Sequence, residues 1–172
     1  MLIGEKETFA IECYRDPRQS ESSRYVFGRM CLWVAGNRLG DIDCPACILN
    51  VTEAHLQALL HRLDTLDDPE VCKLGDRAAF DFLDQRLYGD DERSIEQIRA
   101  DAERFRRFDL LTNGGESFDR AKSFIIGDAD GLRIVFQDNP PGCMSARIDR
   151  SGFIATIRDF LAWVAEGGKD VG

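Results

Sequence analysis

Histidine is scarce in this sequence, and the patterns that mark several common enzyme classes are missing. Only His55 and His61 occur among 172 residues. They stand six residues apart on an expected helix, which turns by about 600° over that distance, so their rings point in different directions and do not form a metal pair. The HExxH, GxSxG, P-loop and GxGxxG patterns do not occur, so no familiar hydrolase or nucleotide-binding signature indicates an enzyme.

Long apolar runs and an excess of basic residues are also absent. No run approaches the ~18–20 apolar residues that a membrane span needs. Glu5 and Glu7 stand where a signal peptide would have its apolar core. We therefore expect a cytoplasmic protein without a membrane partner. The net charge is −9, whereas general nucleic-acid binding needs a basic face, so we expect no nucleic-acid partner either.

Most of the negative charge lies in one segment. Residues 64–92 contain ten acids and three bases, and so carry seven of the nine net negative charges. Such a segment is either a solvated helical surface or a docking face for a basic protein, and charge alone favours neither. The acids that we consider as contact residues lie near its two ends: Asp64, Asp67, Asp68, Asp90, Asp91 and Glu92.

The six cysteines leave a second interpretation of the protein's function open, as a thiol redox or metal-binding domain. A disulfide framework is typical of shorter, secreted chains, so we expect thiols. Cys44 and Cys47 form a CxxC pair that could serve redox exchange or metal binding. The following helix begins too late to activate Cys44, and a second ligand pair for zinc is missing from the sequence. A structural turn between sheet and helices is the favoured interpretation, and the thiol or metal site is the alternative.

Hydrophobic periodicity predicts strands in the first part of the chain. Residues 8–13 alternate, with Phe9, Ile11 and Cys13 on one face. Residues 30–34 are apolar on both faces, as in a central strand, and Gly36-Asn37 is a hairpin signal before a return strand at 39–43.

Three helices are expected next. The first covers residues 51–66, with a leucine stripe and Asn50 or Thr52 as its cap, and the second covers 77–89. The third covers 94–108, capped by Ser94, with Ile95, Ile98, Ala102 and Phe105 along one side. Its end, ERFRRF, interleaves Arg and Phe, as in some proteins that bind single-stranded nucleic acid. The neighbouring acids favour an ordinary amphipathic helix instead.

Strands return before a last helix. Residues 122–128 and 132–137 flank a hairpin turn at 128–131, a second turn at 139–142 precedes a strand at 143–149, and Ser151 is expected to cap the final helix. The order predicts an α+β fold: an antiparallel sheet of about six strands, helices packed on one face, three helices inserted mid-chain and one C-terminal helix. Residues 1–172 are expected to form a single domain.

Three stretches carry a resemblance to a known family. They are Phe9–Glu12, the hairpin from Phe27 through Gly40-Asp41, and the strand-to-helix ending at residues 133–164. They resemble the immunity protein 42 family, whose members are encoded beside polymorphic bacterial toxins and neutralise them. The resemblance implies a bacterial immunity protein with a cognate toxin as its partner, and it supplies no catalytic residue, cofactor or metal site. It does not need Cys44 or Cys47.

The function expected from these observations is stoichiometric inhibition of a toxin by protein–protein binding. The acidic segment would attract a basic toxin over long range. The alternative remains a thiol redox or metal-binding domain that uses Cys44 and Cys47.

Overall fold

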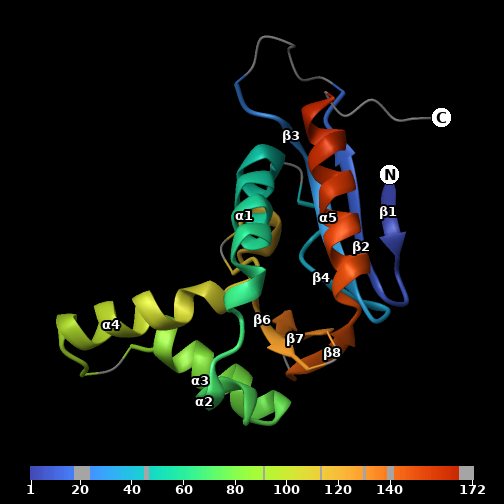
Figure 1. Cartoon of the computed structure of the whole chain (residues 1–172). Coiled ribbons are helices and arrows are strands. Elements are labelled where there is room, and N and C mark those ends of the chain that lie inside the picture. Colours follow the sequence, from blue (N-terminus) through green and yellow to red (C-terminus); the bar gives the residue numbers. More distant parts are fainter. Residues whose placement is uncertain are drawn as a thin grey trace.

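The α+β class predicted from the sequence is confirmed. The computed structural model describes residues 1–17, 24–44, 47–90, 92–112, 114–129, 131–138 and 142–166. Strands lie near both ends of the chain and helices occupy its middle and its end. Figure 1 shows α1 and α5 beside the larger sheet, the smaller sheet below them, and a pair of helices, α3 and α4, extending to one side.

The larger sheet is antiparallel and comes from the first part of the chain. Its strands are β1 (Leu2–Glu5), β2 (Phe9–Arg15), β3 (Phe27–Val34) and β4 (Asn37–Leu39), in that order, with the short β5 (Cys47–Ile48) also paired to β3. The sequence analysis missed β1, an edge strand of four residues that includes Gly4 at φ +87°. Its pattern is too short for periodicity to detect.

The alternation predicted for β2 is confirmed and explains how the sheet is covered. Phe9, Ile11 and Cys13 are buried and pair with Val34, Leu32 and Met30, which are buried too. This face packs against α1 (Leu49–Arg62) and α5 (Arg150–Ala165), which also contact one another. Burying both rows of side chains between a sheet and two helices removes most of their apolar surface from water.

The hairpin turn lies one residue earlier than predicted. Val34 pairs with Asn37, so the two turn residues are Ala35 and Gly36, with φ values of +47° and +77°. Two positive φ values suit a tight hairpin, and glycine supplies one of them without strain. The return strand is also shorter than predicted and ends at Leu39.

The single sheet of about six strands is in fact two sheets. The smaller one consists of β6 (Ala121–Asp128), β7 (Gly131–Asp138) and β8 (Met144–Ile148), all antiparallel. Its first hairpin falls at 128–131 as predicted, while residues 139–141 of the second predicted turn lie outside the described residues. The Gly40 N–H donates to the Asp138 carboxylate at 2.7 Å where the sheets approach each other.

One cluster of buried side chains draws on both sheets and most helices. It contains Ile11 and Leu32 from the larger sheet, Phe124 and Phe136 from the smaller one, and Phe160 from α5. That residues 1–172 form a single domain stays a prediction, which this shared core supports.

The helical middle follows the predicted pattern, although the cap of its first helix does not. After α1 come α2 (Pro69–Cys72), α3 (Asp76–Tyr88) and α4 (Ile95–Phe105), with short 3-10 turns at Leu63–Thr65, Arg106–Phe108 and Glu116–Phe118. Leu56, Leu59 and Leu63 are buried as the leucine stripe requires. Among the described residues, no helix is long and apolar enough to cross a membrane.

Two of the three predicted helix caps are wrong. The α1 helix begins earlier, after Ile48, so Asn50 and Thr52 lie inside it. The Thr52 hydroxyl donates to the Gly114 carbonyl at 2.8 Å, a tertiary contact that the local sequence does not reveal. Asp149, not Ser151, caps α5 by accepting from the Gly152 N–H. Ser94 caps α4 as predicted, in a reciprocal capping box with Gln97.

Candidate functional site

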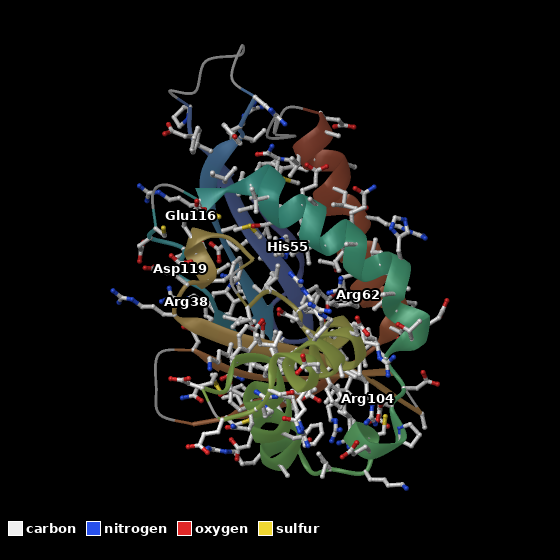
Figure 2. The ribbon with its side chains drawn as sticks, turned by 90° about the vertical axis from the view of Figure 1, so that its left-hand side faces the viewer. Arg38, His55, Arg62, Arg104, Glu116 and Asp119 are labelled. Carbon is white, nitrogen blue, oxygen red and sulfur yellow. The ribbon has the colours of Figure 1, made fainter. Side chains whose placement is uncertain are left out.

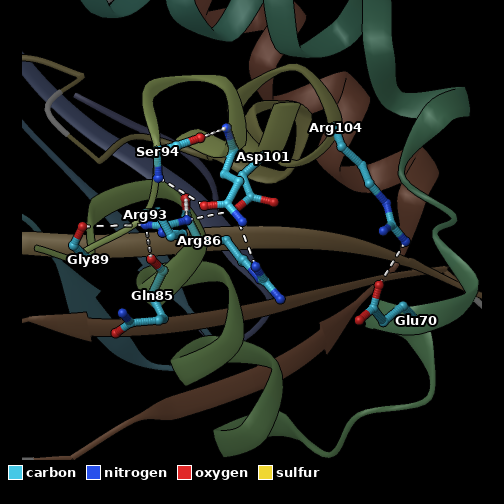
Figure 3. Close-up of polar contacts among 9 residues, drawn as sticks. Glu70, Gln85, Arg86, Gly89, Arg93, Ser94, Asp101 and Arg104 are labelled. Atoms are coloured by element: carbon cyan, nitrogen blue, oxygen red, sulfur yellow. Dashed lines mark hydrogen bonds and ion pairs between the residues drawn. The ribbon is translucent and has the colours of Figure 1, made fainter. Parts of the chain in front are cut away.

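Helices α3 and α4 form a hairpin that extends from the body of the protein (Figure 1). Arg93, in the connection between them, fixes the hairpin. Its guanidinium donates to the carbonyls of Gln85, Arg86 and Gly89 at the end of α3, and to the Asp101 carboxylate on α4 at 2.6 Å (Figure 3). The arginine thus satisfies the last carbonyls of α3 and ties them to α4, so the two helices hold one relative orientation.

Two of the six predicted contact acids lie at the free end of this hairpin. Asp90 and Glu92 are exposed, and Asp91 lies outside the described residues. Nearby Ile95 and Ile98, at the start of α4, are 72% and 46% exposed. The sequence analysis placed both isoleucines on the apolar side of the helix, but only Phe105 on that side is buried in the fold.

Asp64 and Asp67 lie near the other end of α4, between α1 and α2. Both are exposed, and Asp64 pairs with Arg150 on α5. The eleven residues of α4 span about 16 Å, so the helix separates these acids from the hairpin end. Asp64 and Asp67 therefore form one group of charge, and Asp90 and Glu92 form a second one.

Asp68 is placed differently from its neighbours, because its side chain is only 5% exposed. Its carboxylate accepts from Arg104 through two nitrogens, each at 2.9 Å, and from Arg107 at 3.2 Å. It also caps α2 by accepting from the Glu70 N–H. The hydrogen bonds from Arg104 hold the pKa of this carboxyl below its usual value.

These contacts also account for two of the three arginines of ERFRRF, Arg104 and Arg107. Arg104 joins Glu70 as well as Asp68, and Figure 3 shows it reaching from α4 toward α2. Arg104 and Arg107 bind α4 to the acidic segment, which supports the amphipathic interpretation of this stretch.

A hollow of about 620 Å³ lies between α1 and the base of the α3–α4 hairpin. Ala54, His55 and Ala58 of α1 line one side, and Leu87 of α3 and Ala102 of α4 line the other. Figure 2 shows His55 and Arg62 on α1, with Arg104 below them. Sequence reasoning did not find this hollow because residues from α1 and α4 meet there across more than forty positions of chain.

Basic side chains lie around one half-buried acid, Asp109, in this hollow. Arg62 donates to the backbone carbonyls of Arg107 at 3.0 Å and Asp109 at 2.7 Å. The Asp109 carboxylate accepts from the Tyr88 hydroxyl at 2.5 Å and from the Thr112 N–H at 2.9 Å. Burial raises the pKa of Asp109 despite these bonds.

Cys44 lines a different hollow together with Glu116 and Ser117. All six cysteines are free. Burial raises the pKa of the Cys47 thiol, which disfavours the thiolate that redox exchange or metal binding requires. Among the described residues, no group of three or more His, Cys, Asp or Glu side chains could hold a metal ion. Arg38, Glu116 and Asp119 gather around this second hollow (Figure 2).

The face of the larger sheet opposite α1 and α5 carries a polar network. The Glu12 carboxylate accepts from Trp33 Nε1 at 2.8 Å, from Lys6 at 3.0 Å and from the Tyr14 hydroxyl at 2.9 Å. Burial opposes these hydrogen bonds, but together they lower the pKa of Glu12. Burial and the adjacent Glu12 raise the pKa of Cys31 to about 12.

The elements described above define an α+β protein with charged helical surfaces and a hollow lined by several helices. Comparison with known families identifies it more closely: the model of the immunity protein 42 family matches residues 1–163. The chain belongs to this family, and it is an immunity protein that neutralises a toxin. The resemblance found in the sequence is thereby confirmed.

One solved structure shares the fold. The crystal structure of CdiI from Burkholderia dolosa AUO158 superposes with a TM-score of 0.69 at 19% sequence identity, and the match covers 94% of this chain and 99% of the other. At this identity the similarity establishes the architecture. No match to this chain is found among curated proteins.

Proposed function

We propose that this protein neutralises its toxin by stoichiometric binding, without turnover. Membership in the immunity protein 42 family is the observation that carries this proposal. The six free cysteines suit a reducing compartment, so the encounter is assigned to the cytoplasm. A stable complex of this kind buries roughly 1,600 Å² of total surface around a few central anchors.

The exposed acids of the two charged groups attract the toxin, which is basic on this proposal. Asp64 and Asp67 supply one group, and Asp90 and Glu92 supply the other together with Asp91. Complementary charge of this kind speeds diffusional encounter and is screened by salt. Asp68 serves the same surface in another way, because its bonds to Arg104 and Arg107 position α4 beside α2.

Association kinetics at several salt concentrations test this electrostatic role. We expect the association rate constant with the toxin encoded by the adjacent gene to fall at least about tenfold between about 50 mM and about 500 mM salt, with a smaller change in the dissociation rate constant. An association rate that salt does not change would contradict the role of the acids while leaving binding itself intact.

Paired substitutions that neutralise two acids each show which part of the surface attracts the toxin. The Asp64→Asn/Asp67→Asn and Asp90→Asn/Glu92→Gln pairs should each slow association at low salt. The control pair is Glu5→Gln and Glu7→Gln, exposed acids of the β1–β2 turn on the other side of the protein in Figure 1. All three variants change the net charge equally. Equal slowing by all three would show that net charge acts without a local docking face.

A further inference from the structure

The first turns of α4 expose an apolar stripe that the fold leaves uncovered. Ile95 and Ile98 are 72% and 46% exposed, and Ala102 follows them at helical spacing on the same side. Only the last residue of this stripe, Phe105, is buried, against Phe82 of α3. The Arg93 contacts that fix the α3–α4 hairpin hold the stripe in place in the free protein.

This stripe runs into the hollow between α1 and α4. Ala102 lines the hollow, and Ala54 and Ala58 of α1 face it from the other side with Leu87 of α3 beside them. Small side chains on both helices leave room for an inserted side chain. At about 620 Å³, the hollow is within the size range of sites that enclose a substantial group.

The lining of the hollow carries net positive charge. Three arginines and one aspartate line it, and Asp109 already accepts from Tyr88 and Thr112. The exposed Arg106 makes no side-chain hydrogen bond or ion pair within the described part of the chain, and the buried Nε of Arg107 has no hydrogen-bond partner there. The exposed guanidinium of Arg106 suits a carboxylate, which arginine binds through directed N–H groups.

We propose that the groove between Ala102 of α4 and Ala54 and Ala58 of α1, which the exposed Ile98 and Ile95 extend along α4 away from the hollow, receives a segment of the toxin that presents an apolar side chain next to a carboxylate. The inference rests on the proposed function and assigns its central contact. The exposed acids of the two charged groups speed the approach of a basic toxin, and the groove holds the inserted segment. A pre-formed groove lowers the conformational cost of binding.

Two identical substitutions on exposed alanines test this assignment. Ala58→Arg places a long side chain in the groove, whereas Ala100→Arg places the same side chain on the opposite side of α4. Both residues are exposed helix positions, and both variants gain one positive charge. We expect Ala58→Arg to weaken toxin binding at least about 30-fold, the scale of a hot-spot loss, and Ala100→Arg to bind nearly as the wild type does.

The carboxylate has its own test in Arg106→Glu. This variant makes the protein more acidic, so general attraction would speed its association with a basic toxin. Loss of a specific arginine–carboxylate pair instead raises the dissociation rate constant, and we expect an increase of at least about tenfold. Thermal unfolding of every variant confirms that the fold is intact.

Four results separate the possible outcomes. Failure of the wild type to bind the toxin would contradict the proposed function itself. If the wild type binds the toxin and the Ala58→Arg and Ala100→Arg variants bind it with equal affinity, the groove is not the toxin contact, and the proposed function still stands. An unchanged dissociation rate constant for Arg106→Glu would contradict the proposed contact between Arg106 and a carboxylate of the toxin. A self-associated free protein that Ala58→Arg makes monomeric, with toxin affinity unchanged, would show that the groove holds a second copy of this chain.

Discussion

Asp68 provides the sharpest test of how the acidic segment is used, because a nearby acid of the same type serves as its control. The Asp68 carboxylate is 5% exposed, accepts from two nitrogens of Arg104 and one of Arg107, and caps α2. Asp64 is 95% exposed and pairs with Arg150. Asp68→Asn and Asp64→Asn remove the same charge from two very different surroundings.

The expected loss at Asp68 follows from these contacts. Removing one partner of a fully buried ion pair costs about 3–5 kcal/mol. Arg104 and Arg107 are 47% and 31% exposed, so both regain water and the cost falls to about 2–3 kcal/mol for Asp68→Asn, which still provides a good cap. Asp68→Ala also removes the cap and loses about 1 kcal/mol more. At this chain length, the Asn variant should melt about 4–12 °C lower.

The pH dependence gives the loss a direction. Hydrogen bonds from Arg104 depress the pKa of Asp68 in the folded protein. The charged carboxylate therefore stabilises the fold above the unfolded pKa, and this contribution disappears as the pH falls through the lower folded pKa. The difference in unfolding free energy between the wild type and Asp68→Asn should be largest near neutral pH and should shrink in acid.

Urea unfolding of the wild type and the three variants, between pH 7 and pH 2.5, measures these differences. Asp64→Asn should leave the unfolding free energy nearly unchanged, as an exposed pair does. Equal stability of Asp68→Asn and Asp64→Asn at pH 7 would refute the structural role of Asp68. So would a loss at Asp68 that stays constant down to the lowest pH.

Two further predictions concern other buried groups. Tyr88→Phe deprives the Asp109 carboxylate of a hydrogen bond and should lower the unfolding free energy measured in urea by about 1–3 kcal/mol. Tyr14→Phe at the exposed sheet face should change this free energy little. Equal effects of the two substitutions would contradict the burial argument. Cys31 is buried and its pKa is raised to about 12. At pH 8 an alkylating reagent should therefore modify the exposed Cys72 in the folded protein and reach Cys31 only after unfolding. Mass spectrometry of the labelled peptides measures both reactions. Rapid labelling of Cys31 in the folded state would contradict its placement.

The sequence predicted the kinds of elements well, because their patterns are local. The alternation of Phe9, Ile11 and Cys13 matches one buried face, and the leucine spacing of α1 matches another. The caps of α1 and α5 could not be predicted as reliably. The Thr52 hydroxyl bonds to Gly114, sixty-two residues away, and Asp149 and Ser151 are both suitable caps two residues apart. The second sheet was missed because alternation of apolar residues predicts where strands lie but not which strands pair with one another.

The candidate site was harder to predict for the same reason. Asp68 has the same residue type as Asp67 and Asp64, and only the folded chain brings Arg104 to it from thirty-six residues away. Ile98 has the spacing of a buried residue, but periodicity does not distinguish a side chain covered by its own fold from one left at the surface.

Titration of toxin activity with this protein tests the central claim most directly. The account predicts that activity falls linearly and reaches zero at one molecule of immunity protein per toxin, that the inhibited toxin is chemically unaltered, and that separating the two restores its activity. Progressive loss of activity at a small fraction of that ratio, with a modified or cleaved toxin, would show turnover and would contradict inhibition by binding.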